Sequence, residues 1–257
     1  MKKKSYAKVN IFLKIAGIRG NYHELVSRFV RVHSLYDLIS FENKECKDFS
    51  LEGEFGCELK KNTIYKAYEK LKVLSPKVEE FFKEHLVKVE KNIPEFAGLG
   101  GGSSNCATFM NMVNIVCNLN LSKDQLATIG STIGADVPFF IYEYDSANVT
   151  GIGEIVEKFD EPILNIEVIT PPIKCDTGKI FSTFRNFFYK EIDYKQKEEL
   201  LNLDSKVILR KLSINEANDL YEPALYNYEQ LNIYNKQDWY FSGSGSSFFR
   251  LNGEVNG

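Results

Sequence analysis

The chain has 257 residues, of which 44% are hydrophobic and 26% charged, and its formal net charge is −3. A chain of this length and composition can bury one large core or two modest ones, so one or two globular domains are expected. The slightly negative charge argues against a surface that neutralises many phosphates, and no nucleic-acid partner is expected.

The cysteines number five, and no two of them form a C-x-x-C pair. This pattern indicates neither a disulfide framework nor a zinc knuckle, so we expect buried, reduced thiols. Lys8, Asn10 and Lys14 interrupt the apolar run near the N-terminus, and no stretch approaches the roughly 20 apolar residues of a membrane span. A cytoplasmic protein without a membrane partner is predicted.

The first predicted elements are strands. Residues 6–15 alternate between apolar and more polar side chains, which predicts a half-buried strand with Lys8 and Asn10 on its more polar face. Residues 23–42 predict one or two further strands. Residues 62–74 then predict a helix capped by Asn62, with apolar residues at helical spacing.

A glycine-rich stretch, FAGLGGGSSNCATF, follows the predicted strand that ends near residue 95 and precedes a predicted helix. Backbone N–H groups in such a turn, together with the dipole of the following helix, favour an anion. Glycine also lets phosphate oxygens approach the backbone closely. We therefore predict a phosphate-binding loop; a flexible linker or a tight structural turn is the alternative. Neither the dinucleotide fingerprint nor the P-loop pattern fits, because the required glycine or lysine is missing.

The rest of the chain divides near residue 160. Before it, the pattern predicts a short helix capped by Ser122, a turn with Asp136 and Pro138, an apolar strand, and a hairpin. After it come a buried strand, several polar helices and a second Gly/Ser turn. We predict domains at residues 1–160 and 161–257.

The glycine loop resembles the P-x-x-x-G-L-G-G-G-S-S element of the GHMP small-molecule kinases, which include galactokinase, homoserine kinase and mevalonate kinase. The segments AKVNIFLKI with YHEL, GADVPFF and SGSGSSFF occur in the order of that superfamily. Within it, the sequence most resembles the kinases of the non-mevalonate isoprenoid pathway that phosphorylate the 2-hydroxyl of 4-diphosphocytidyl-2-C-methyl-D-erythritol. The resemblance implies an α+β fold, with an N-terminal domain like the second domain of ribosomal protein S5 and a ferredoxin-like C-terminal domain.

The same resemblance implies the two catalytic residues. Asp136 matches the aspartate that accepts the proton of the substrate hydroxyl. Lys8 matches the lysine that pairs with this aspartate and opposes charge on the transferred phosphoryl group. Taken alone, Asp136 could be an ordinary turn residue that hydrogen-bonds the local backbone, and Lys8 could be a solvated lysine on a strand.

Binding residues are implied in the same way. For ATP they are Pro94, Gly98, Leu99, Gly100, Gly101, Gly102, Ser103 and Ser104. For the cytidine diphosphate-linked alcohol they are Asn10, Tyr22, His23, Thr177, Phe181, Gly243, Ser244 and Gly245. Tyr22 and His23 are expected to lie against the cytosine, through stacking and a directional hydrogen bond, with Phe181 on its opposite side. Mg²⁺ is expected with ATP, but no carboxylate cluster identifies protein ligands for it.

Two motifs depart from the usual pattern. The usual DGYHE is GNYHE here, with Gly20 and Asn21 before the Tyr-His pair, and the usual GSGSCVF is GSGSSFF. Because of the first change, the turn before the base pocket is expected to differ. The alternatives are a kinase for homoserine or mevalonate, and a nucleotide-binding regulator or RNA-binding module. A monomer or a homodimer is expected.

Overall fold

The computed structural model describes residues 1–252, and their contacts divide into two compact units. The first unit contains Met1–Ala7, Leu35–Ile93 and Gly101–Glu143, and the second contains Lys8–Ser34, Pro94–Gly100 and the chain from Tyr144 onward. These bounds are not those of the predicted domains, because the N-terminal strands and the start of the glycine loop group with the later part of the chain. A division at residue 160 stays a prediction.

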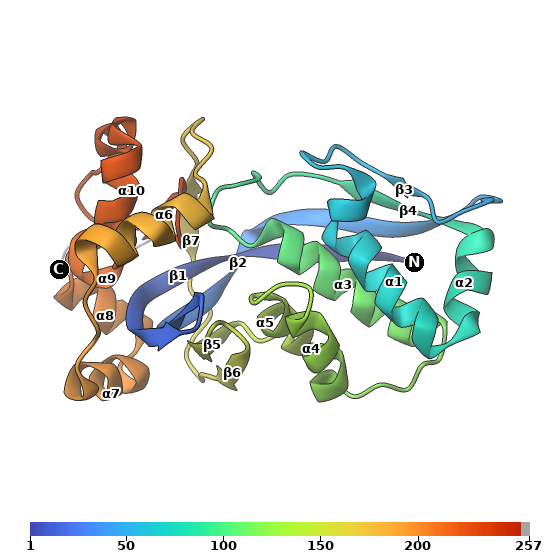
Figure 1. Ribbon diagram of the computed structural model, residues 1–257, viewed down its shortest axis with the longest axis horizontal. Helices are drawn as coiled ribbons and strands as arrows, with labels where there is room; N and C mark the ends of the chain where they lie inside the picture. The colour runs from blue at the N-terminus through green and yellow to red at the C-terminus, as the bar shows by residue number, and fades with distance from the viewer. Residues whose placement is uncertain (253–257) are drawn as a thin grey trace. The chain divides into compact units, whose positions relative to one another are not determined.

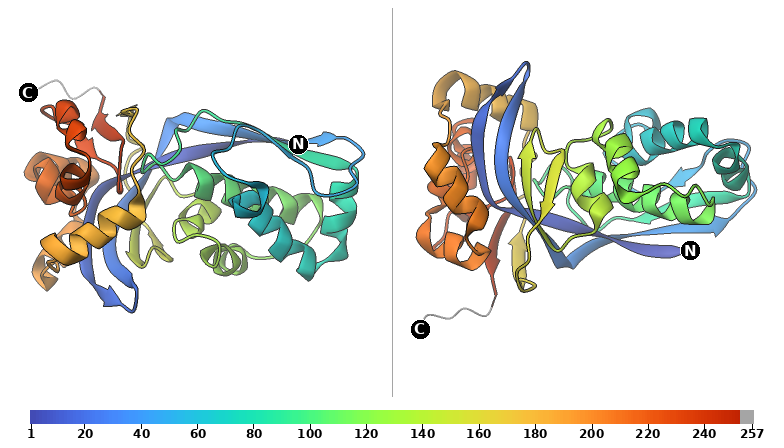
Figure 2. Two further views of the ribbon diagram at one scale, coloured as in Figure 1. Left: turned by 45° about the horizontal axis from the view of Figure 1, so that its top comes forward. Right: turned by 90° about the horizontal axis from the view of Figure 1, so that it is seen from below.

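Two long antiparallel strands, β1 (Lys2–Arg19) and β2 (Tyr22–Asn43), run side by side and turn back at residues 20–21 (Figure 2). Residues 23–42, predicted as one or two strands, belong to the single strand β2. The prediction of a half-buried β1 was wrong, because Lys8 and Asn10 are only 3% and 2% exposed. Burial of these polar side chains is tolerated because they hydrogen-bond to each other and to protein groups.

In the first unit, residues 38–43 of β2 pair antiparallel with β4 (His85–Glu90), and β3 (Leu51–Glu52) pairs parallel with β4. Helices α1 (Thr63–Leu74) and α5 (Val137–Tyr142) pack on α3 (Gly101–Val116), and α4 (Lys123–Ser131) packs on α5 (Figure 1). The remaining elements are η1 (Leu59–Lys61) and α2 (Pro76–Lys83).

The predicted helix starts in the first unit are confirmed. The side chain of Asn62 accepts a hydrogen bond from the backbone N–H of Ile64 at 2.9 Å, and Ser122 forms a capping box with Gln125. The predicted apolar strand after Pro138 is instead the helix α5, whose residues 137–141 are all buried. A short apolar run does not distinguish strand from helix, and proline in the first helical turn favours the helix.

The second unit contains two sheet segments. Residues 25–30 of β2 pair with β5 (Ser146–Gly151), which forms the predicted hairpin with β6 (Ile155–Lys158). A separate antiparallel sheet has the order β7 (Ile166–Ile169), β9 (Phe248–Leu251), β8 (Tyr240–Phe241). The helical segments are α6 (Thr177–Thr183), η2 (Phe184–Phe188), α7 (Tyr194–Asn202), α8 (Ser205–Lys211), α9 (Ile214–Ala217), α10 (Tyr221–Asn227) and η3 (Glu229–Tyr234).

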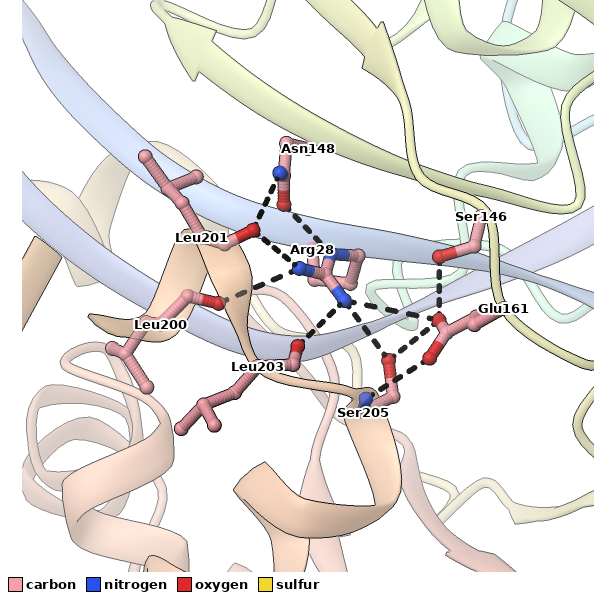
Figure 3. Close-up of polar contacts among 8 residues, drawn as sticks. All are labelled: Arg28, Ser146, Asn148, Glu161, Leu200, Leu201, Leu203 and Ser205. Atoms are coloured by element: carbon pink, nitrogen blue, oxygen red, sulfur yellow. Dashed lines mark hydrogen bonds and ion pairs between the residues drawn. The ribbon is translucent and has the colours of Figure 1, made fainter. Parts of the chain in front are cut away.

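A fully buried arginine fastens the end of α7 and the start of α8 to the sheet (Figure 3). Arg28 donates to the carbonyls of Leu201 at 3.0 Å and Leu203 at 3.2 Å, and to Oδ1 of Asn148 at 2.7 Å. The carboxylate of Glu161 lies 3.9 Å away and accepts hydrogen bonds from Ser205. The guanidinium therefore satisfies carbonyls that the helix end leaves without partners.

Cysteine burial follows the prediction only in part. Cys106, Cys117 and Cys175 are buried, and burial raises the pKa of the Cys117 thiol to about 11. Cys57 is exposed and Cys46 is partly exposed, so the expectation of buried thiols was wrong for these two. No helix within residues 1–252 has the length and apolar character needed to cross a membrane.

Candidate active site

Lys8 and Asn10 form a buried polar cluster on one face of β1, as residues two apart on a strand do. Nζ of Lys8 donates to Oδ1 of Asn10 at 2.6 Å, and Nδ2 of Asn10 donates to Oγ of Ser27 at 2.9 Å. Ser27 in turn donates to the carbonyl of Phe12. The ammonium group also lies 4.4 Å from the centroid of the Phe29 ring. The amide of Asn10 is thereby oriented, with its oxygen toward the lysine.

The glycine loop is hydrogen-bonded directly to this strand. The backbone N–H of Lys8 donates to the carbonyl of Leu99 at 3.0 Å. Gly98 and Gly100 have φ angles of 74° and 70°, in the left-handed region that favours glycine. The structure thus brings the predicted catalytic lysine beside the first half of the predicted phosphate loop.

Gly98 is a glycine for a reason that the sequence did not reveal. A Cβ atom at this position would lie 2.1 Å from the carbonyl oxygen of Ser242, and Oγ of Ser242 donates to the Gly98 carbonyl at 3.0 Å. A Cβ at Gly243 would lie 3.2 Å from the Gly98 carbonyl oxygen and 3.4 Å from Oδ1 of Asn10. The two Gly/Ser turns therefore pack against each other, next to the lysine cluster.

The second Gly/Ser turn connects β8 to β9, and the predicted residues Gly243, Ser244 and Gly245 all lie in it. Nδ2 of Asn218 donates to the carbonyls of Phe241 and Gly243, both at 2.9 Å. Ser244 and Thr177 share a hydrogen bond of 2.8 Å between their hydroxyl groups. Thr177 thus lies next to this turn.

In the first unit, the start of α3 offers backbone N–H groups at the N-terminus of a helix of 16 residues. A Cβ at Gly102 would meet only Oγ1 of Thr63, at 3.8 Å, so this glycine leaves room for a ligand. Ser103 lies in the same turn, and a Cβ at Gly134 would lie 3.4 Å from its Oγ. The turn that leads to Asp136 therefore lies against the start of α3.

Asp136 occupies the N-cap position of α5, but its side chain makes no capping hydrogen bond. Its roles as catalytic base and as ordinary turn residue both stay predictions. Lys8 and Asp136 belong to different units, and their pairing stays a prediction.

A polar network that the sequence did not single out supports the start of α3. Oδ1 of Asp37 accepts hydrogen bonds from the backbone N–H groups of Asn92 and Ile93, at 2.7 and 2.8 Å. Its Oδ2 accepts from Lys91 and from Nδ2 of Asn105. Asn105 and the predicted Ser104 both hydrogen-bond to the hydroxyl of Ser5. The network holds the segment before Pro94 and the first turn of α3 together.

The predicted base pocket is partly assembled in the second unit. The imidazole of His23 stacks on the Phe181 ring, with centroids 5.1 Å apart and planes inclined by 29°, and its edge meets Phe184. His23 is buried, whereas Tyr22 is 64% exposed. A base cannot lie between His23 and Phe181 at this spacing. Tyr22 is therefore the ring that remains for stacking, and His23 is suited to hydrogen bonding.

Burial and the neighbouring Arg185 lower the pKa of His23 below its ordinary value. Nε of Arg185 donates to Nε2 of His23 at 3.4 Å. Sequence reasoning missed Arg185, although it follows Phe181 by four residues, the spacing of one helix face. It also missed Ser27. The available signal was the alternation of side chains along β2, which places every second residue on the same face of the strand.

Comparisons with known proteins identify the family. Residues 62–144 match the family described as the GHMP kinases N terminal domain. The chain is 53% identical, over 98% of its length and 97% of the relative's, to the 4-diphosphocytidyl-2-C-methyl-D-erythritol kinase of Sulfurimonas denitrificans. The chain belongs to the 4-diphosphocytidyl-2-C-methyl-D-erythritol kinase family. A second member, from Campylobacter jejuni strain 81116, is 38% identical over 96% of this chain and 99% of its own length.

Solved structures give the same fold. A crystal structure of 4-(cytidine 5'-diphospho)-2C-methyl-D-erythritol kinase matches with a TM-score of 0.72 at 26% identity, and covers 98% of this chain and 90% of its own. The mevalonate kinase of Methanococcus jannaschii matches with a TM-score of 0.58 at 14% identity, over 99% and 91% of the two chains, which shows the fold alone. The predicted GHMP kinase fold, with mixed α and β structure, is confirmed.

Proposed function

We propose that this family member transfers the γ-phosphoryl group of ATP to the 2-hydroxyl of 4-diphosphocytidyl-2-C-methyl-D-erythritol, in the non-mevalonate route to isoprenoid precursors. The observation that carries the proposal is the buried Lys8 ammonium on a strand whose backbone hydrogen-bonds to Leu99 of the glycine loop. A fixed cation beside a phosphate-binding loop is what phosphoryl transfer requires.

Different residues are proposed to bind the phosphates, to stabilise the transferred group and to accept the proton. The loop from Pro94 to Ser104 and the N-terminus of α3 bind the phosphates of ATP, which the open space at Gly102 permits. Lys8 opposes negative charge on the transferred group, and Asn10 orients the lysine and the acceptor. Asp136 accepts the proton of the substrate hydroxyl. Mg²⁺ would accompany ATP and offset phosphate charge; no cluster of three metal-binding side chains occurs within residues 1–252, so we assign it no protein ligand.

The second unit supplies recognition of the cytidine part. Tyr22 is the ring proposed to stack on the base, while His23, which stacks on Phe181, hydrogen-bonds to the edge of the base. Thr177 and the turn from Gly243 to Gly245 line the same ligand. The proposal describes a cytoplasmic enzyme, monomeric or homodimeric, that acts on small molecules and not on nucleic acid or membrane.

The first test compares substrate-dependent ADP release by the native protein and by Asp136→Asn, with Mg-ATP and the diphosphocytidyl substrate. We expect at least a 10²-fold lower turnover for the variant, because a general base contributes about 10² to 10⁴ in rate. Asp124→Asn is the matched control, since Asp124 lies on α4 and its carboxylate accepts a hydrogen bond from Tyr142.

Homoserine and mevalonate serve as alternative acceptors in the same assay. Absence of ADP release with the diphosphocytidyl substrate from folded native protein contradicts the proposal, and release with either alternative reassigns the acceptor. Full activity of Asp136→Asn leaves the reaction in place and removes Asp136 as the base.

A further inference from the structure

Arg185 approaches the edge of the base pocket from η2, a π-helical turn that follows α6. Its Nε donates to Nε2 of His23 at 3.4 Å, and its Nη2 donates to the carbonyl of Gly20 at 3.5 Å. Gly20 is one of the two residues that replace the usual Asp-Gly before the Tyr-His pair. The guanidinium thus joins the altered turn to the imidazole.

We infer that Arg185 is a positioning residue that fixes the tautomer of His23, and that this tautomer lets the pocket distinguish cytosine from uracil. The inference rests on the proposed function, in which His23 hydrogen-bonds to the base.

The tautomer follows from the direction of the hydrogen bond. A guanidinium has N–H donors and no acceptor, so the Nε2 atom that receives its hydrogen bond must carry a lone pair. The neutral ring then carries its proton on Nδ1. The lowered pKa of His23, which comes from burial and from the charge of Arg185, agrees with a ring that stays neutral.

The ring is also held in orientation. Phe181 stacks on one face of the imidazole, and Phe184 meets it edge to face with centroids 5.8 Å apart. No partner for Nδ1 occurs among the hydrogen bonds of residues 1–252, so this donor is available to a ligand. The pocket therefore presents a fixed N–H donor and not an interchangeable donor or acceptor.

The edges of the two pyrimidines respond differently to such a donor. Cytosine has acceptors at O2 and N3, whereas uracil has a donor N–H at position 3. A fixed Nδ1–H group can donate to N3 of cytosine but opposes the N3–H of uracil. A site built to hydrogen-bond one partner rejects the analogue that leaves polar groups unpaired. Without Arg185, the ring could exchange tautomers and accept from uracil.

The test uses the full chain labelled with ¹⁵N-histidine, which contains only three histidines. Long-range ¹H–¹⁵N spectra distinguish Nδ1–H from Nε2–H, and His23→Gln assigns the signals. Dissociation constants for CMP and UMP are measured by titration calorimetry on the native protein and on Arg185→Met. Arg19→Met is the matched control, because Arg19 lies near the same hairpin but pairs with Glu24 and Glu154.

We expect an Nδ1–H tautomer and a preference for CMP over UMP in the native protein and in Arg19→Met. Arg185→Met should show mixed tautomers, a raised His23 pKa, and a preference for CMP that is lower by roughly fivefold to tenfold, the value of one hydrogen bond. These changes are specific, because a merely structural role would weaken CMP and UMP binding equally.

An unchanged tautomer in Arg185→Met, or an unchanged ratio of the two dissociation constants, overturns the inference and leaves the proposed reaction standing. If the native protein binds neither nucleotide, or binds both equally, cytosine recognition by this pocket fails, and the proposed substrate fails with it. The spectra separate the two cases, since they report on Arg185 without any ligand.

Discussion

The ammonium group of Lys8 lies 2.6 Å from the amide oxygen of Asn10, two residues along the same strand, and both side chains are buried. Because the amide also donates to Ser27, its oxygen and not its nitrogen faces the lysine. Lys8 therefore has a neutral neighbour that orients it without cancelling its charge.

Asn10→Asp should lower turnover by at least about tenfold, because a carboxylate at this position would neutralise the charge that Lys8 directs at the phosphoryl group. Steady-state ADP release measures the effect, and thermal unfolding checks that the variant is folded. Ser27→Ala removes the partner of the amide without adding a charge, and should cost less. Native turnover in folded Asn10→Asp would show that the charge of Lys8 does not act on the reaction.

Gly98→Ala and Gly102→Ala should have opposite effects. The first places a Cβ 2.1 Å from the Ser242 carbonyl oxygen at a φ of 74°, so we expect a loss of about 2–4 kcal/mol in the free energy of unfolding. The second meets no atom closer than 3.8 Å and lies in α3, so stability should hold or rise by up to about 1 kcal/mol.

Kinetics separate the two glycines further. If phosphates approach the backbone at Gly102, a methyl group there should raise the KM for ATP by roughly tenfold without loss of fold. Chemical denaturation and ATP titration of both variants provide the measurement. An unchanged KM in Gly102→Ala would mean that this part of the loop is not in contact with the nucleotide.

Arg28→Met should lower the free energy of unfolding by about 3–5 kcal/mol, because it leaves the buried carboxylate of Glu161 and several helix carbonyls without their cation. Arg250→Met is the comparison: its ion pair with Glu167 is partly exposed, and its loss should cost about 1 kcal/mol or less. Urea unfolding of both variants tests the difference. Equal losses would mean that the Arg28 network adds little to stability.

The lowered pKa of His23 predicts a pH dependence of stability. The unfolded chain binds a proton near the ordinary value of 6.5, whereas the folded chain resists it until a lower pH. The free energy of unfolding should therefore fall as pH decreases from 6.5 through the lowered folded value. His23→Asn should reduce this slope, and denaturation midpoints between pH 7 and 5 measure it. A slope that His23→Asn leaves unchanged would assign the dependence to other groups.

Much of the fold followed from local patterns. The helix starts were predicted from capping residues, Asn62 and Ser122, and from the glycine-rich turn that leads into α3. The structure has a helix starting at each of these three places. The wrong predictions concern two segments in which burial in the folded protein does not follow from the pattern of apolar and polar residues. A six-residue apolar run forms α5 and not a strand, and the polar face of β1 is buried because its polar groups satisfy one another.

For the site, the sequence indicated which residues to examine but not what they contact. From the sequence, we predicted that phosphate approaches the backbone at Gly98. In the structure, the atoms nearest to a Cβ at this position belong to Ser242. We assigned His23 to the base from the motif, but the four-residue spacing between Phe181 and Arg185 did not show that Arg185 contacts His23, 162 residues away in the chain. Long-range contacts of this kind depend on tertiary structure that local patterns do not encode.

The contact between the two Gly/Ser turns has a consequence for dividing the protein. Ala97 and Gly98 accept hydrogen bonds from Ser247 and Ser242, near the end of the described chain. A fragment that stopped at residue 160 would contain every residue of the glycine loop but none of these donors. Such a fragment would have the glycine-rich sequence but would lack the hydrogen bonds from Ser242 and Ser247 that hold the loop in its conformation. We expect the fragment to bind ATP weakly, and the affinity for ATP to return only when the C-terminal fragment is added back.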